Sequence, residues 1–93
     1  MIKSFKNKET EKIFNRYFSK RYPYEIQRRG LLQLRSLHNA GGINDLRNPP
    51  SNHPKKLSGD RAGQYSIRIN DQWRICFTWD GSDAHDVEIT DHH

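Results

Sequence analysis

The stretch Gly63–Asp80, GQYSIRINDQWRICFTWD, decides the fold of this 93-residue chain. It contains two segments in which hydrophobic and polar side chains alternate, the pattern of strands with one buried and one exposed face. Asn70–Gln72 between them has the composition of a tight hairpin turn. One predicted face carries Tyr65, Ile67, Ile69, Trp73, Ile75, Phe77 and Trp79. The other face is small and polar and carries Arg68 and Arg74. We expect helices to cover the first face and the functional site to lie on the second, with Arg74 facing solvent.

Two helices are predicted before this hairpin. Asn7 is a suitable N-cap for the first helix, whose apolar stripe continues to about Lys20. Pro23 can begin a second helix, and Gly41-Gly42 can end it. The apolar positions are Ile13, Phe14, Tyr17 and Phe18 in the first helix and Ile26, Leu31, Leu34 and Leu37 in the second. An opening strand is expected at residues 1–5.

The segments that flank the hairpin complete the architecture. Asn48–Ala62 has the composition of a long irregular loop, and loops of this length are more often functional than not. After a turn at residues 81–83, a last strand is predicted with His85, Val87 and Ile89 on one side. The predicted order is strand, helix, helix, strand, strand, strand. Residues 1–93 should therefore form one α+β domain, a small, mostly antiparallel sheet with two helices packed on one face.

Composition narrows the classes of function. Lys and Arg number 16 against 11 Asp and Glu, a formal charge of +5 that favours a polyanionic partner, above all nucleic acid. The sequence has no run of 18 apolar residues and no signal peptide, so a cytoplasmic protein without membrane contact is expected. The single Cys76 excludes an internal disulfide and a multi-cysteine zinc site, and it is expected to be a half-buried strand residue. No HExxH, GxxxxGK[ST] or GxGxxG pattern is present, and we expect no metal and no cofactor.

Nine residues could form a cationic site with titratable groups at its rim. They are Arg68 and Arg74 on the polar face, His53, Lys55, Lys56 and Arg61 in the loop, and Asp91, His92 and His93 at the C-terminus. Such a set suits RNA cleavage without a metal, because histidine can move protons and cationic side chains can stabilise the charge that grows on the phosphoryl group. The alternative for each is ordinary: a solvated strand or loop cation, or a frayed terminal histidine.

Three segments carry a resemblance to a known family. They are MIKSFKNK at residues 1–8, DLRNPPSNHPKKLSGDRAGQYSIRINDQWRICFTW at residues 45–79, and VEITDHH at residues 87–93. With them the whole chain resembles the HigB-type toxins of the RelE superfamily. The resemblance implies a compact RelE-like α+β fold and a small ribonuclease that cuts messenger RNA on the translating ribosome. It also implies a partner, the helix-turn-helix antitoxin HigA, which binds the toxin and represses the shared operon, so that operator DNA is reached only through the antitoxin complex.

The resemblance also implies roles for individual residues. Arg74 matches the strand arginine of the active-site face, and Asp91 and His93 match the ends of a C-terminal Asp-Tyr-His motif. His53 matches the histidine of a His-Pro element, and Lys55–Lys56 match its nearby basic residues. Arg74, Asp91, His92 and His93 are therefore expected to be catalytic, and His53, Lys55, Lys56, Arg61 and Arg68 to bind RNA.

The sequence departs from the family pattern at three positions. His92 replaces the penultimate tyrosine, Asn70 replaces a residue that is basic in several relatives, and Ser58 stands where some relatives have lysine. The acid or base can then be either terminal histidine, and Arg68 can compensate for lost positive charge. An alternative stays open, in which the chain is a weakened or inactive relative that acts as an RNA- or antitoxin-binding module.

Overall fold

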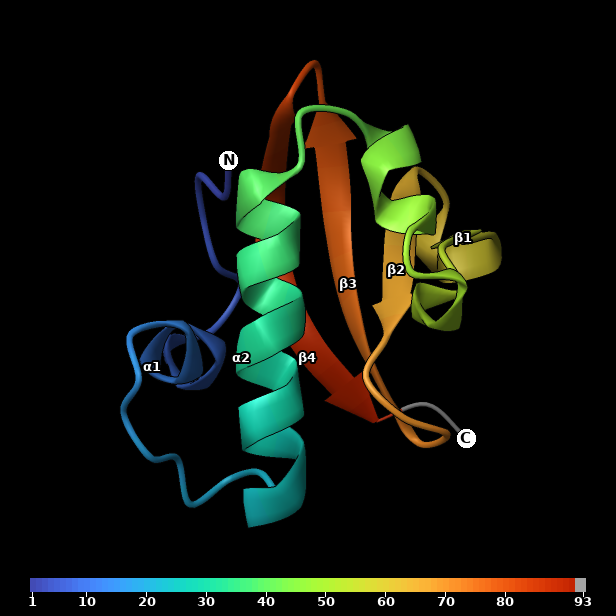
Figure 1. Cartoon of the computed structure of the whole chain (residues 1–93). Coiled ribbons are helices and arrows are strands. Elements are labelled where there is room, and N and C mark those ends of the chain that lie inside the picture. The colour runs from blue at the N-terminus through green and yellow to red at the C-terminus, as the bar shows by residue number, and fades with distance from the viewer. Residues whose placement is uncertain (92–93) are drawn as a thin grey trace.

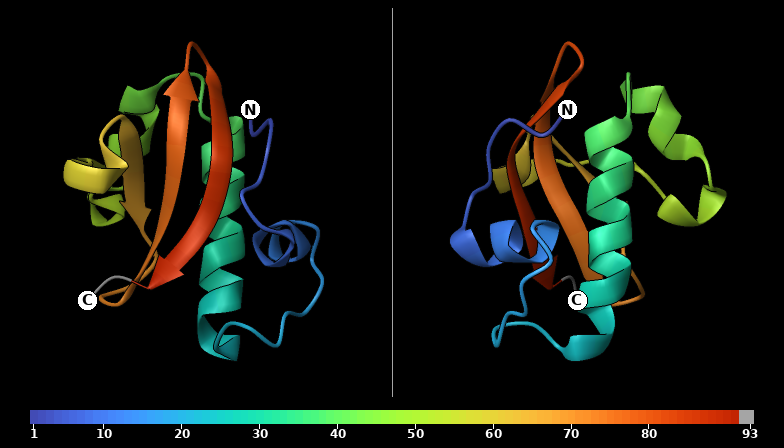
Figure 2. Two further views of the ribbon diagram at one scale, coloured as in Figure 1. Left: turned by 180° about the vertical axis from the view of Figure 1, so that it is seen from behind. Right: turned by 60° about the vertical axis from the view of Figure 1, so that its left-hand side comes forward.

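The computed structural model describes residues 1–91, which form two helices and a four-stranded antiparallel sheet. The elements are α1 (Lys8–Phe14), α2 (Tyr24–Asn39), β1 (Lys55–Lys56), β2 (Gln64–Arg68), β3 (Trp73–Asp80) and β4 (Asp83–Asp91), and the strands lie in the order β1-β2-β3-β4. Both helices pack on one face of the sheet, as predicted (Figure 1). Seen from behind, neither α1 nor α2 lies on the opposite face of the sheet (Figure 2).

The N-terminal segment, which was predicted to be an opening strand, runs beside β4 but forms less than a full strand. Ile2 and Phe5 make isolated parallel bridges to Ala84 and Val87 of β4. The amide of Lys3 donates to the carbonyl oxygen of Ala84 at 2.8 Å. These contacts cover the outer edge of β4, which would otherwise offer unpaired backbone groups to a second chain.

Helix α1 begins where the sequence predicts and ends earlier. The Oδ1 atom of Asn7 accepts from the Thr10 amide at 2.8 Å, which confirms the N-cap. The helix stops at Phe14 because Arg16 takes a left-handed conformation, with φ of 68°, that no α-helix continues. The predicted continuation of the apolar stripe to Lys20 is therefore wrong, and Tyr17 and Phe18 lie exposed in the segment between the helices.

Helix α2 provides most of the cover for the sheet. It begins directly after Pro23 and buries Ile26, Leu34 and Leu37, as predicted. It ends at Asn39, and the expected glycine cap is wrong: Ala40 caps the helix in an extended conformation, and the amides of the next two residues, Gly41-Gly42, donate to Oδ2 of Asp45. Its apolar side chains meet the inward face of β2, β3 and β4, where Ile67, Ile75, Phe77, Val87 and Ile89 are buried.

Strand β4 contains an irregularity that the alternation does not predict. Asp86 has a φ of 52°, and the pairing register with β3 shifts between Cys76 and Thr78. The extra residue places Ala84 and Val87 on the same buried side. The prediction that His85 shares a face with Val87 and Ile89 is therefore wrong, because His85 precedes the bulge.

The predicted loop at residues 48–62 is more ordered than its composition indicates. It contains two short 3-10 turns and the edge strand β1, which the sequence analysis missed. Asn52 is buried at its centre, where Nδ2 donates to the Leu46 carbonyl at 3.1 Å and Oδ1 accepts from Gln33 Nε2 of α2 at 2.7 Å. These bonds tie the loop to α2, and they place His53 and β1 at the side of the sheet.

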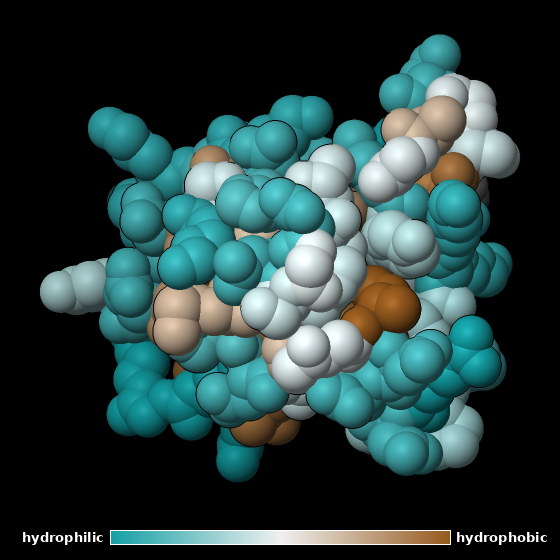
Figure 3. Space-filling view, turned by 90° about the horizontal axis from the view of Figure 1, so that it is seen from above, coloured by the Kyte–Doolittle hydropathy of each residue, from teal (hydrophilic) through white to brown (hydrophobic). Residues whose placement is uncertain are grey.

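The end of the molecule where β3 turns into β4 is mainly hydrophilic. A view onto this end shows hydrophobic groups only in small, separate areas (Figure 3). Within residues 1–91, neither helix has both the length and the apolar character needed to span a bilayer.

Candidate functional site

The side chain of Arg74 lies buried on the sheet face that the helices leave uncovered. It is only 6% exposed, so the expectation that it faces solvent is wrong. Its Nε donates to Ser66 Oγ at 2.8 Å, and its Nη2 donates to the carbonyl oxygens of Ser66 and His53. The loop at residues 48–62 buries this side chain by folding back over the edge of the sheet.

The charge of Arg74 is not balanced by a neighbouring acid. All three of these acceptors are neutral oxygens, and none of the carboxylates in residues 1–91 forms an ion pair with this guanidinium. Burial lowers the pKa of Arg74, repulsion from Arg68 lowers it further, and the Cys76 thiol acts in the opposite direction. An arginine nevertheless stays protonated at neutral pH. The Arg74 guanidinium is therefore a cation that is fixed in position and partly removed from water, and a bound anion would stabilise it.

A hollow of about 270 Å³ opens beside Arg74 on the same face. We call it the arginine hollow, and its lining is Leu57, Ser58, Arg61, Ser66, Arg74, Cys76, Thr90 and Asp91. Ligand pockets usually begin at roughly 300 Å³, so the hollow is small for an isolated ligand and suits one phosphate group of a longer polymer. It brings together the strand arginine and the C-terminal acid that the sequence predicts to act together.

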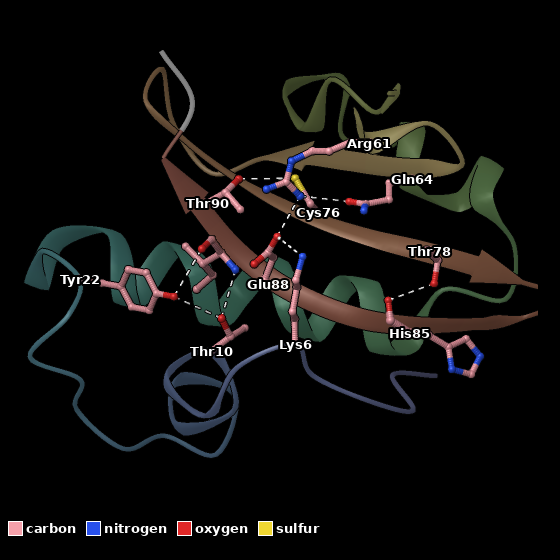
Figure 4. Close-up of polar contacts among 11 residues, drawn as sticks. Lys6, Thr10, Tyr22, Arg61, Gln64, Cys76, Thr78, His85, Glu88 and Thr90 are labelled. Atoms are coloured by element: carbon pink, nitrogen blue, oxygen red, sulfur yellow. Dashed lines mark hydrogen bonds and ion pairs between the residues drawn. The ribbon is translucent and has the colours of Figure 1, made fainter. Parts of the chain in front are cut away.

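Arg61 closes one wall of the arginine hollow. Its Nη1 donates to Glu88 Oε1 at 2.8 Å and to Gln64 Oε1 at 3.1 Å, and Lys6 Nζ lies 3.7 Å from the same carboxylate oxygen (Figure 4). The hydrogen bond that Arg61 donates to Glu88 raises the pKa of Arg61. The ion pair joins the turn at residues 59–61 to β4, so much of the positive charge of Arg61 is already compensated.

The C-terminal end of β4 is held in place by hydrogen bonds from the helix side of the sheet. The Ile89 amide donates to Thr10 Oγ1 at 3.1 Å, and the Tyr22 hydroxyl donates to the Ile89 carbonyl at 3.3 Å (Figure 4). Asp91 follows two residues later, opposite Trp73 in the register, and accepts from Gln72 Nε2 at 3.2 Å. The position of Asp91 thus depends on contacts from the helix side and from the turn between β2 and β3.

Comparison with known proteins assigns the chain to a family. A family model described as "RelE-like toxin of type II toxin-antitoxin system HigB" matches residues 3–93. The chain belongs to the HigB-like toxins. Among curated relatives of this HigB-like toxin is "Endoribonuclease HigB" of Proteus vulgaris, which is 34% identical over 94 residues and is matched over 100% of both chains. "Toxin HigB-1" of Vibrio cholerae serotype O1 is 35% identical over 82 residues, covering 85% of this chain and 84% of the relative.

A solved structure confirms the RelE-like fold. A chain of the YoeB-YefM complex from Staphylococcus aureus superposes with a TM-score of 0.62 and covers 100% of this chain and 97% of its own, at 21% identity. The shared architecture is the α+β layer predicted from the alternation and from the family resemblance.

Arg68 stands next to the arginine hollow of this HigB-like toxin. It lies opposite Arg74 in the β2–β3 register, so the two side chains leave the same face of the sheet, as predicted. Its Nη2 forms an ion pair with Asp71 in the hairpin turn. Arg68 therefore adds to the positive potential at Arg74 but is outside the lining of the hollow.

The loop cations divide between the two faces of the sheet. In the β1–β2 register Lys55 lies opposite Ser66 and Lys56 opposite Tyr65. Directly opposed residues leave the same face, so Lys55 shares the side of Arg74 and Lys56 faces the helix side. His53 is exposed at a left-handed position, with φ of 41°, and it reaches the site through its backbone carbonyl.

Two of the predicted site residues cannot be placed, and two residues near Arg74 and Arg61 were not predicted. His92 and His93 lie outside the described residues. Sequence reasoning missed Ser66, which orients Arg74, and Glu88, which pairs with Arg61. Ser66 lies on the predicted polar face, two residues before Arg68. A hydroxyl so close to two arginines on one face could have indicated its role. The Glu88 contact depends on the fold of the loop and had no such signal.

Proposed function

We propose that this HigB-like toxin is an endoribonuclease that cleaves messenger RNA on the translating ribosome, in the cytoplasm, and that the arginine hollow binds the scissile phosphate. The observation that carries the proposal is the buried guanidinium of Arg74, held by neutral oxygens and unpaired with any acid of residues 1–91. Retaining such a cation costs stability, so its presence favours a function for it. The name of the Proteus vulgaris relative, Endoribonuclease HigB, supports the same activity.

The proposed reaction needs two proton transfers and one site for negative charge. A base removes the proton of the ribose 2′-hydroxyl, its oxygen attacks phosphorus, and the bond from phosphorus to the 5′-oxygen breaks as an acid protonates that oxygen. The products are a 2′,3′-cyclic phosphate and a 5′-hydroxyl. Arg74 stabilises the charge on the phosphoryl oxygens, and His92 or His93, oriented by Asp91, moves the protons. These groups suffice for the chemistry, so we propose a metal-independent reaction.

The path of the RNA is proposed from the cations around the hollow. Lys55 and Arg68 flank Arg74 on the same face, and His53 is exposed beside it, so these three contact the backbone on either side of the cleaved bond. We propose that Lys56 contacts RNA at the edge of the sheet. Arg61, paired with Glu88, contacts RNA while it keeps the wall of the hollow in place.

Two partners belong to the proposal. Membership of a family of type II toxin-antitoxin systems supports an antitoxin encoded beside this toxin. We propose a HigA-like helix-turn-helix protein, through which the complex reaches operator DNA, whereas the toxin alone meets messenger RNA on the ribosome.

The test compares Arg74→Met with Arg29→Met, which removes an exposed arginine of α2 as a matched control. Purified wild-type toxin is added to ribosomes translating a defined message, and primer extension maps new 5′ ends. We expect in-frame cuts from the wild type and the control, a loss of roughly 10²–10³-fold from Arg74→Met, and no cuts in message without ribosomes. Cut ends that carry a 5′-phosphate and a 3′-hydroxyl would contradict the proposed chemistry, and full activity of Arg74→Met would contradict the site.

The same experiment separates an alternative, a binding module without cleavage. The observation that favours it is that Arg74 already donates three hydrogen bonds within the chain. A binding module would sediment with ribosomes and leave no new 5′ ends, even in the wild type.

A further inference from the structure

Glu88 of β4 is an acidic side chain on the sheet face that we propose to bind RNA. It lies opposite Cys76 in the β3–β4 register, and Cys76 lines the arginine hollow. The side chain of Glu88 is only 12% exposed. A carboxylate that is largely removed from water and lies beside a phosphate site should repel RNA, so its presence there needs a physical reason.

Two cations meet the carboxylate of Glu88. Arg61 Nη1 donates to Oε1 at 2.8 Å, and Lys6 Nζ lies 3.7 Å from the same oxygen (Figure 4). Lys6 precedes α1, and Arg61 ends the short turn at residues 59–61, so the contact joins three separate parts of the chain. The side chains of Lys6 and Arg61 are 54% and 40% exposed. Glu88 is therefore the largely buried centre of a row of three charges whose two ends reach the surface.

Of these three side chains, Arg61 lines the arginine hollow. Within residues 1–91 its side-chain hydrogen bonds come from Nη1, which donates to Glu88 and to Gln64. A guanidinium carries five N–H donors, so Nε and Nη2 can still donate to a phosphate. Arg61 can then contact Glu88 and RNA at the same time, but one positive charge attracts two anions that repel each other. The carboxylate therefore weakens the attraction between Arg61 and a phosphate.

We propose that Glu88 attenuates RNA binding at the arginine hollow through its ion pair with Arg61, and that Lys6 limits this attenuation. The inference rests on the proposed function, in which the hollow receives an RNA phosphate. Lys6 neutralises part of the charge of Glu88, which leaves more of the field of Arg61 for the phosphate. Glu88 acts through Arg61 and not on the reacting atoms, so it sets the affinity for RNA and leaves the chemical step unchanged.

A purely structural role for the same contacts predicts a different result. If the ion pair served only to hold the turn at residues 59–61 against β4, its loss would loosen the wall of the hollow and weaken RNA binding. Attenuation predicts the reverse, because a neutral side chain at position 88 no longer competes with the phosphate for Arg61. The sign of the change in affinity therefore separates the two roles.

The test measures the affinity of the toxin for ribosomes that carry a message with 2′-methoxy groups at the cut site, which the proposed reaction cannot cleave. Glu88→Gln retains an oxygen that can accept from Arg61 and removes only the charge. The matched control is Asp86→Asn, which removes an exposed carboxylate from the same strand at a left-handed position that asparagine tolerates. Glu88→Gln should bind about fivefold more tightly than the wild type. The control should differ little, because salt screens an exposed charge.

Lys6→Gln should change the affinity in the opposite direction. Without Lys6 the full charge of Glu88 acts on Arg61, so binding should weaken by about twofold more than in the control Lys8→Gln, which removes an exposed lysine from the same region. In the Glu88→Gln background, Lys6→Gln should have no more effect than Lys8→Gln, because the charge through which Lys6 acts is gone. Urea denaturation checks that each variant is folded.

Weaker or unchanged binding by Glu88→Gln would overturn the inference, as would an equal gain in Asp86→Asn. An effect of Lys6→Gln that keeps its full size in the Glu88→Gln background would also overturn it. Cleavage of unmodified message keeps the inference apart from the proposed function: in Glu88→Gln the KM should fall while kcat stays near that of the wild type. A wild type that binds these ribosomes but never cuts refutes only the ribonuclease, and the affinities of the variants still decide the role of Glu88.

Discussion

The two faces of the central sheet bury side chains of opposite chemistry. On the helix side Ile67, Ile75 and Phe77 pack against α2 and are almost completely buried. On the other side Arg74 and Ser66 are nearly as buried, yet a loop covers them, and hydrogen bonds to neutral oxygens are their main contacts. Hydrocarbon burial stabilises a fold, whereas burial of an unpaired cation costs free energy. The difference indicates that the first face maintains the structure and that the second is kept for binding.

The largest effect should come from the helix side. Phe77→Ala removes a ring that is 1% exposed at the centre of the core. The cavity and the lost burial should lower the free energy of unfolding by about 3–5 kcal/mol, a large part of the total for so small a domain. Urea denaturation followed by circular dichroism measures the change. Phe18→Ala, which truncates an exposed ring, is the control and should have little effect, and equal losses from both would break the comparison.

Arg74→Met on the other face should have a much smaller effect on stability. Methionine fills a similar space without a charge to desolvate, but it leaves three oxygens without their donor. The two effects oppose each other, so the free energy of unfolding should change by less than about 2 kcal/mol. The same variant should lose RNA cleavage, as expected for a residue retained for function. Urea denaturation again provides the measurement. A loss of stability as large as that of Phe77→Ala would mean that Arg74 holds the fold together, and the contrast between the faces would fail.

These two faces also differ in how far the sequence predicts them. Period-two alternation assigns Ile75 and Arg74 to opposite sides of one strand, and the structure confirms this assignment. Alternation does not predict how deeply a side chain is buried. The burial of Arg74 depends on a contact with the carbonyl of His53, which is 21 residues away in the sequence. A local pattern cannot encode such a contact. The family resemblance therefore proposed Arg74 as a site residue and left its environment to the structure.

Other incorrect predictions concern single elements of the fold. Nothing in the composition of β4 signals the bulge at Asp86, so His85 was assigned to the wrong side. The apolar residues Tyr17 and Phe18 continue the spacing of α1, but the chain leaves the helix at Arg16, and tertiary structure overrides the pattern. The two-residue β1 was missed because Lys55–Lys56 have no strand signature and pair only through the backbone.

Ser66→Ala sharpens the comparison by leaving Arg74 in place without its side-chain acceptor. Ser66 Oγ accepts from Arg74 Nε at 2.8 Å, and the loss of this bond leaves a buried donor unsatisfied. The free energy of unfolding should fall by about 1–3 kcal/mol. A positioning role also predicts a lower kcat at nearly unchanged KM in the ribosome assay, with partial recovery in Ser66→Thr. The control is Ser58→Ala, an exposed serine of the same hollow, and an identical kinetic profile for the two variants would remove Ser66 from the site.

The smallest effect should come from Glu9→Gln, which tests whether surface charges of the helix side contribute to its stability. A hydrogen bond from Ser19 Oγ, at 2.7 Å, and the neighbouring Lys12 lower the pKa of Glu9. The unfolded chain has the ordinary glutamate pKa of roughly 4.3, so the contribution of Glu9 is complete above that pH and is lost as the pH falls through the lower pKa of the folded state. Urea midpoints of wild type and variant should therefore differ slightly at pH 7 and converge in acid. Glu11→Gln, which removes an exposed carboxylate from the same turn of α1, is the control. A difference that persists unchanged below the folded pKa would mean that the substituted amide disturbs packing rather than charge, and the stability of the helix side would then depend on its surface as well as on its core.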